Sequence, residues 1–268
     1  MFREITLGQY YPVDSVLHRL DPRTKLMGTL IYIVALFVSS SWVGYVLAIL
    51  GLCGLIALSK VPVGYMFRGL RAIYILLLIS VLCNLLLTQG DIVWQFAFIK
   101  ITSQGLDMAV KMAVRLVCLV MGTSLMTLTT TPNNLTDGLE KGLGILGKVG
   151  VPVHEIAMMM SIALRFIPIL VEETDKIMKA QAARGADFES GGLITKAKAM
   201  VPLLIPLFVT AFRRAGDLAT AMEARCYHGG EGRTKMKPLK YGPNDRTAYI
   251  CMLLYLAVSI AIRVFFKG

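Results

Sequence analysis

The chain has 268 residues, of which 56% are hydrophobic and only 17% charged, and its mean hydropathy is +0.65. Soluble domains carry about 25% charged residues, so the composition excludes a disordered chain and disfavours a soluble enzyme. The net charge of +11 is typical of nucleic-acid binding or, in so apolar a chain, of Lys and Arg held on the cytoplasmic side of a membrane. The hydropathy favours the second explanation, so we expect a lipid bilayer and no nucleic acid around this chain.

The cysteines and the N-terminus give no sign of a secreted protein. None of the five cysteines forms a C-x-x-C pair, and four lie in apolar runs. We therefore expect neither a disulfide framework nor a structural zinc site. Residues 1–15 are polar and lack the apolar core of a signal peptide, so no cleaved leader is indicated.

The first apolar stretch, residues 26–59, contains no charge. As one helix it would be about 50 Å long, too long to cross a hydrocarbon core of about 30 Å once. Three serines and Trp42 lie in its middle, and Trp42 suits a membrane interface. We predict two spans, 26–40 and 43–59, with a shallow re-entrant hairpin as the alternative.

Three further uncharged stretches predict spans at residues 72–90, 116–136 and 247–262. The fold class expected is therefore an all-α polytopic membrane protein with about five transmembrane helices. The fourth span can begin at Gly105, which brings three charges onto one helix face, because Asp107, Lys111 and Arg115 are spaced i, i+4, i+8. Such a face indicates either a structural ion pair with snorkelling or a path for a solute or proton.

The basic residues set the orientation. Segments 1–25, 60–71 and 131–245 together hold 22 of the 28 Lys and Arg, so the N-terminus and residues 131–245 are expected in the cytoplasm. Five spans then place the C-terminus outside. Arg263 and Lys267, which lie in that outer segment, fit this orientation less well.

The sequence predicts three regions: an N-terminal membrane domain 1–130, a cytoplasmic region 131–245 and a C-terminal span 246–268. The middle region is too long to be an unstructured loop. Its turn residues divide it into about three helices, at 134–147, 152–183 and 193–226.

The two long cytoplasmic helices each join an apolar half to a charged half, a pattern typical of a helix that lies at a membrane surface. Their apolar halves fall short of the roughly 20 residues that a span needs. Three consecutive methionines suit either ordinary core packing or an adaptable docking surface, and prolines are expected to kink both helices. These positions are Met158, Met159, Met160, Pro168, Pro202 and Pro206.

Two apparent catalytic or ligand motifs fail in context. Residues 142–148 spell glycine-rich nucleotide signatures, but no strand precedes them and Val149 stands where a P-loop needs Ser or Thr. His154-Glu155 begins an H-E-x-x-H string that Met158 breaks. We expect a non-catalytic chain with no cofactor and no metal.

The strongest signal is a near repeat at the ends of the two long helices, Ala183-Arg184-Gly185 and Ala224-Arg225-Cys226. A cation suits the helix C-terminus, so capping alone is one explanation. The helices are each about 45 Å long and are joined by a short connector, so their C-terminal ends must lie well apart. Two separated, similar arginines between small residues suit two similar sockets with carboxylates.

Together these features resemble the transmembrane T component, EcfT, of energy-coupling factor (ECF) transporters. The resemblance rests on Ser15–Lys25, on Leu128–Pro132 and on the two arginine motifs, and it covers essentially the whole chain. T components join a substrate-binding S component to a pair of ATP-binding-cassette ATPases, whose grooves receive the arginine motifs.

The resemblance also implies roles for individual residues. The ATPase-coupling residues would be Ala183, Arg184, Gly185, Ala224, Arg225 and Cys226, with Cys226 departing from the expected glycine. The apolar halves of the long helices, with the methionines and prolines named above, would cradle the S component, which topples to release a vitamin or metal ion. The location implied is the bacterial cell membrane.

Two alternatives stay open on sequence alone. The chain can serve one dedicated importer or be shared among several S components. It can also be a self-contained channel or secondary transporter, which the charged face at Asp107, Lys111 and Arg115 would favour.

Overall fold

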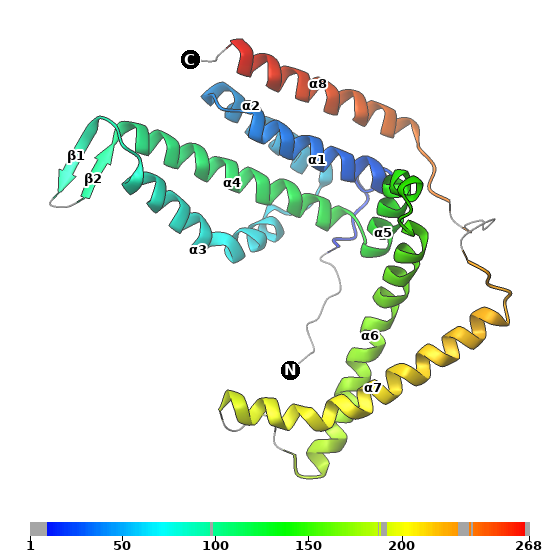
Figure 1. Cartoon of the computed structure of the whole chain (residues 1–268). Helices are drawn as coiled ribbons and strands as arrows, with labels where there is room; N and C mark the ends of the chain where they lie inside the picture. Colours follow the sequence, from blue (N-terminus) through cyan, green and yellow to red (C-terminus); the bar gives the residue numbers. More distant parts are fainter. Residues whose placement is uncertain are drawn as a thin grey trace. The chain divides into compact units, whose positions relative to one another are not determined.

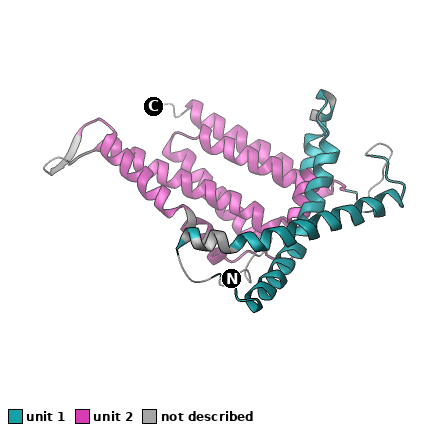
Figure 2. Ribbon diagram, turned by 60° about the horizontal axis from the view of Figure 1, so that its bottom comes forward, with its two compact units in different colours: residues 1–7, 139–238 teal, residues 8–138, 239–268 magenta. Residues whose placement is uncertain are grey.

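The computed structural model describes residues 10–96, 99–186, 188, 192–229, 236 and 238–265. Within this part the chain forms two compact units (Figure 2). Unit 1 covers residues 139–238, and unit 2 is formed by the residues before and after it. Unit 1 is thus an insertion between two stretches of unit 2.

Most elements of the described chain are α-helices (Figure 1). Unit 2 contains α1 (Pro22–Val38), α2 (Trp42–Ser59), α3 (Val63–Leu87), β1 (Ile92–Phe96), β2 (Ile99–Thr102), α4 (Ser103–Thr129), the start of α5 (Pro132–Gly142) and α8 (Pro243–Phe265). Unit 1 contains the 3₁₀ helix η1 (Leu143–Val149), α6 (Val153–Ala183) and α7 (Leu193–Glu223). The predicted all-α class is confirmed.

The break predicted between the first two spans is present, because α1 ends at Val38 and α2 begins at Trp42. Ser41 is the N-cap of α2, and its hydroxyl accepts a hydrogen bond from the Gly44 N–H. A serine cap satisfies a backbone donor that a continuous helix would have used internally, so this cluster of serines starts a second helix.

α4 forms the centre of unit 2, where it packs against α1, α2 and α3, while α8 packs on α1 (Figure 1). The Tyr32 hydroxyl of α1 donates to the Cys118 carbonyl of α4 at 3.1 Å. Gly122 lies against the Tyr32 ring, and a Cβ there would overlap the ring. The buried core around this contact is apolar and includes Leu36, Ala48, Leu52, Met66, Met121, Leu125 and Leu128.

By length and composition, four described helices are able to cross a membrane: α2, α4, α6 and α8. α3 makes a fifth if its two parts, Val63–Arg71 and Ile73–Leu87, which meet at 64°, form one broken span. Only 6% of the apolar window of α8 is buried, as expected where lipid rather than water surrounds the helix. The chain is a multi-pass membrane protein.

Two helices differ from the predicted spans in extent or number. α6 also qualifies as a span by length and composition, although the apolar run read from its sequence is shorter than the roughly 20 residues that a span needs. α1, which holds most of the first predicted span, 26–40, has 17 residues and is about 26 Å long, a little less than a hydrocarbon core.

Two local elements were not predicted. Residues between α3 and α4 form an antiparallel pair, β1 and β2, in which Trp94 pairs with Ile101 and Phe96 with Ile99. The predicted helix over 134–147 is also wrong at its end, because α5 stops at Gly142 and a 3₁₀ helix follows. Closely spaced glycines lower the stability of an α-helix, which explains the change.

Candidate functional site

The two long helices of unit 1, α6 and α7, cross each other (Figure 1). An ion pair joins them near the crossing, with Arg214 of α7 at 3.6 Å from the Glu173 carboxylate of α6. Both helices continue through their internal prolines. Their C-terminal ends, which carry the two arginine motifs, lie apart (Figures 1 and 2).

The first arginine motif closes α6 with a Schellman cap. The Gly185 N–H donates to the Ala182 carbonyl and the Ala186 N–H donates to the Gln181 carbonyl, both at 3.0 Å. This pair of backward bonds requires a left-handed residue just after the helix, and Gly185 has φ +91°. Arg184 is the last residue before that reversal.

The second arginine motif closes α7 in the same way. The Cys226 N–H donates to the Glu223 carbonyl at 2.9 Å, and the Tyr227 N–H donates to the Met222 carbonyl at 3.0 Å. Cys226 has φ +54°, so a cysteine takes the left-handed position that glycine fills in the first motif. The departure from glycine therefore leaves the backbone path unchanged, and Arg225 precedes the reversal as Arg184 does.

The two guanidinium groups are exposed, and among the described residues neither has an ion-pair or hydrogen-bond partner. Two carbonyls near the end of each helix, those of Gln181 and Ala182 in α6 and those of Met222 and Glu223 in α7, accept backbone N–H groups, so the backbone itself closes both reversals. Ala183 and Ala224 are exposed beside them and leave room for another backbone to approach. The structure thus presents two separate tips of matching geometry, each with one exposed arginine that no described residue pairs with.

The methionines and prolines singled out from the sequence lie in the apolar halves of the same helices. Met159 and Met160 are 57% and 42% exposed, Met158 is half-buried, and Pro168 and Pro202 are exposed while Pro206 is half-buried. The apolar half of α7, which was predicted from the sequence, forms an exposed stripe whose individual residues, spaced i, i+4, were not singled out. The stripe consists of Met200, Val201, Leu204, Ile205, Phe208, Val209 and Phe212.

The charged face of α4 contacts the first residues of α2 and the turn that precedes them. The Asp107 carboxylate binds the Lys111 ammonium at 2.6 Å and accepts the Trp42 indole N–H at 2.7 Å. The Arg115 guanidinium donates to the Tyr45 hydroxyl at 2.7 Å and to a backbone carbonyl of the turn. These bonds account for the charges structurally and favour the ion-pair interpretation over a solute path.

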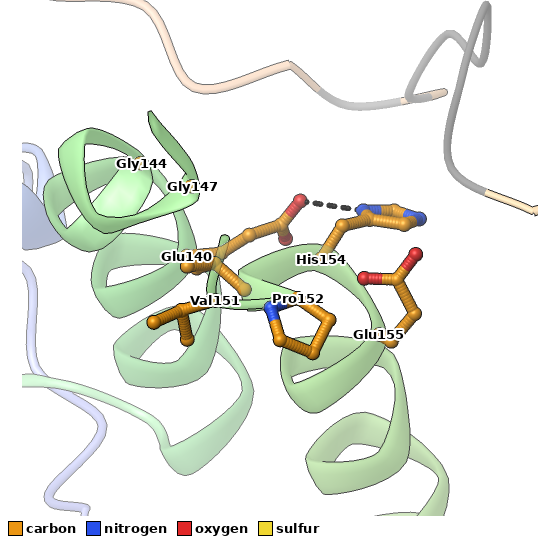
Figure 3. A pocket seen from close by; sticks show the side chains of 8 residues that line it. Glu140, Gly144, Gly147, Val151, Pro152, His154 and Glu155 are labelled. Atoms are coloured by element: carbon orange, nitrogen blue, oxygen red, sulfur yellow. Dashed lines mark hydrogen bonds and ion pairs between the residues drawn. The ribbon is translucent and has the colours of Figure 1, made fainter. Parts of the chain in front are cut away.

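The glycine-rich stretch that resembles a nucleotide motif lines an open pocket of about 320 Å³ in unit 1 (Figure 3). His154 Nδ1 and Glu140 Oε1 lie 3.0 Å apart at its rim, and Glu155 adds a second carboxylate. The carboxylates would repel a phosphate group, and η1 follows a helix where a nucleotide-binding motif needs a strand. Both features argue against a nucleotide site in this pocket. Among the described residues no three His, Cys, Asp or Glu side chains are placed to hold a metal ion.

Fold and site define a multi-pass helical membrane protein with a crossed helix pair that presents two matched arginine tips. A family model described as CbiQ, cobalt transport protein, matches residues 14–236. The chain is 53% identical over 266 residues to the "Energy-coupling factor transporter transmembrane protein EcfT" of Clostridium kluyveri, and the alignment covers 98% of each chain. A relative of the same name from Bacillus subtilis is 45% identical over 264 residues, 98% of this chain and 100% of the relative. The chain belongs to this CbiQ/EcfT family of transporter transmembrane proteins.

Proposed function

We propose that the chain is the energy-coupling membrane subunit of an ECF-type importer in the bacterial cell membrane. It links two ABC ATPase subunits, which hydrolyse the ATP, to an S component that binds a vitamin or a metal ion. The observation that carries this proposal is the pair of exposed arginines in matching helix caps at separate ends of crossed helices, for which the described residues supply no partner.

Each cap suits the insertion of an arginine into a groove. The Schellman bonds fix the backbone around Arg184 and Arg225, so little backbone entropy is lost when a partner orders the tip. A guanidinium forks onto a carboxylate with two parallel hydrogen bonds, and the small residues beside it let the groove close around the backbone. Two tips then require two sockets, as a pair of ATPase subunits offers.

Energy coupling follows from this attachment. When ATP binding closes the ATPase pair, the two tips are drawn together, and the crossing of α6 and α7 changes. The apolar halves, with Met158, Met159, Met160 and the stripe on α7, cradle the S component and carry the movement to it. In this proposal the N-terminus and residues 131–245 lie on the cytoplasmic side, between the membrane domain 1–130 and the C-terminal span 246–268, and the apolar half of α6 lies at the membrane surface instead of crossing the membrane.

The proposal is tested by replacing Arg184 and Arg225 together with alanine and measuring which ATPase subunits purify with the tagged chain. We expect their yield to fall at least about tenfold, because each charge-assisted contact contributes about 1.5–3 kcal/mol. The matched control is Lys179→Ala with Arg213→Ala, which removes one exposed cation from each of the same helices. Equal ATPase yields from both variants and the wild type would refute the proposal.

A further inference from the structure

The motif Asp21–Lys25 lies in a buried cluster of charges in unit 2. Asp21, Lys25 and Asp245 are 6%, 8% and 3% exposed, although such residues are almost never buried unless they are paired. The Arg23 guanidinium donates two hydrogen bonds of 3.0 Å to the Asp21 carboxylate, and Asp245 accepts the Asp21 backbone N–H at 2.9 Å. The cluster thus joins the start of α1 to the start of α8.

The chain segment that leads from unit 2 into unit 1, the first junction, contacts this motif. Unit 2 ends at Gly138, which lies so close to Pro22 that a Cβ there would be 3.0 Å from the proline Cβ. A few residues earlier the Lys25 ammonium donates to the Thr129 carbonyl at 2.8 Å and so holds the end of α4. The same ammonium binds the His18 carbonyl at 3.2 Å, which ties in the N-terminal segment.

The second junction is fastened to it as well. Unit 2 resumes at Leu239, and within six residues the chain reaches Tyr241, Gly242 and Asp245. The Asp245 carboxylate accepts the Gly242 N–H at 2.7 Å with one oxygen and the Asp21 N–H with the other. The Arg23 guanidinium lies 4.0 Å from the centre of the Tyr241 ring.

We propose that Asp21–Lys25 is the common anchor of both chain connections to unit 1, through which a displacement of α6 and α7 reaches the membrane helices. This inference rests on the proposed coupling function and assigns its transmission step to specific residues. Both connections are held by hydrogen-bonded charges out of water, where such bonds are strong and replacement by solvent is costly. A displacement of either connecting segment therefore moves the ends of α1, α4 and α8 together.

The test uses the full complex with its ATPases and S component in lipid nanodiscs. Amide hydrogen exchange is measured with and without Mg-ATP plus vanadate, for the wild type and for Asp245→Asn. The asparagine keeps one acceptor but turns an N–H₂ group toward one of the two backbone N–H donors. We expect about tenfold faster exchange at Asp21 and Gly242, a retained nucleotide response in α6 and α7, and a lost response in α1 and α8.

Two further variants keep the test decisive. Tyr241→Leu removes the exposed ring that contacts the Arg23 guanidinium and the Tyr249 ring, and it should weaken the response of α8 while the charges of the cluster stay in place. Asp14→Asn, an exposed carboxylate of the same unit, makes the same charge change away from the cluster and should respond like the wild type. An undiminished response of α1 and α8 in both Asp245→Asn and Tyr241→Leu would overturn the anchor. No nucleotide response of α6 and α7 in the wild type would overturn the proposed function, and the anchor with it.

Discussion

The matched caps of α6 and α7 make a prediction about the residue at the left-handed position. Replacing Gly185 by alanine places a Cβ at φ +91°, where an L-residue is strained by about 1–2 kcal/mol. The strain acts against the two backward hydrogen bonds, so the last turn of α6 opens more often. Because RT is about 0.59 kcal/mol, we expect the Ala186 amide to exchange about 5–30 times faster.

The converse change, Cys226→Gly, relieves the strain at φ +54° and should slow exchange at the Tyr227 amide by a few-fold. The gain is small because glycine loses more backbone entropy than cysteine when it is ordered, and this loss offsets part of the relieved strain. The assay is amide hydrogen exchange followed by mass spectrometry on the protein in detergent. Gly216→Ala is the control, because Gly216 lies inside α7 with nothing within 4 Å of a new Cβ. If Gly185→Ala and Gly216→Ala leave the Ala186 amide equally protected, the assigned cap is wrong.

Three further predictions concern charges elsewhere in the chain. Lys25 lies in the first turn of α1, outside the spans, and burial lowers its pKa to about 8, although Asp245 and Asp21 partly oppose this shift. Between pH 8 and about pH 10.5 the folded protein has therefore released a proton that the unfolded chain still binds, so the free energy of unfolding rises with pH, by up to roughly 3 kcal/mol. Melting temperatures measured at pH 7.5 and 9.5 should show this rise in the wild type and not in Lys25→Met. Asp107→Asn should lower stability by less than about 1 kcal/mol and leave uptake by the assembled importer intact, whereas lost uptake at unchanged stability would restore the solute path. A double-mutant cycle with Glu173→Gln and Arg214→Gln should give a coupling energy near 0.5 kcal/mol, and a value of zero would remove this pair from the helix crossing.

Local signals in the sequence were sufficient for the helices and for the positions of the two arginine motifs. The serines at 39–41 predicted the break between α1 and α2, and the glycines and prolines predicted α6 and α7 to within a few residues. These features depend on capping and chain reversal, which act over a single turn and are therefore visible in a short stretch of sequence.

Features that depend on distant partners were not predictable in this way. Nothing near Cys226 in the sequence shows that it takes a left-handed conformation, because cysteine has no preference for that region. The partners of Arg115 and Lys25 lie on other helices, 70 and 104 residues away, so only the folded chain reveals them. The strand pair β1–β2 is short and lies between two spans, where hydropathy dominates the pattern.

The most direct test of the central claim places a photo-crosslinking amino acid at position 184 or at position 225 in the assembled, membrane-embedded complex. The account predicts that each position forms adducts with an ATPase subunit, while the same probe at the exposed position Lys179, set back from the tip, gives far less. Adducts with lipid, or none at either tip in the intact complex, would contradict it.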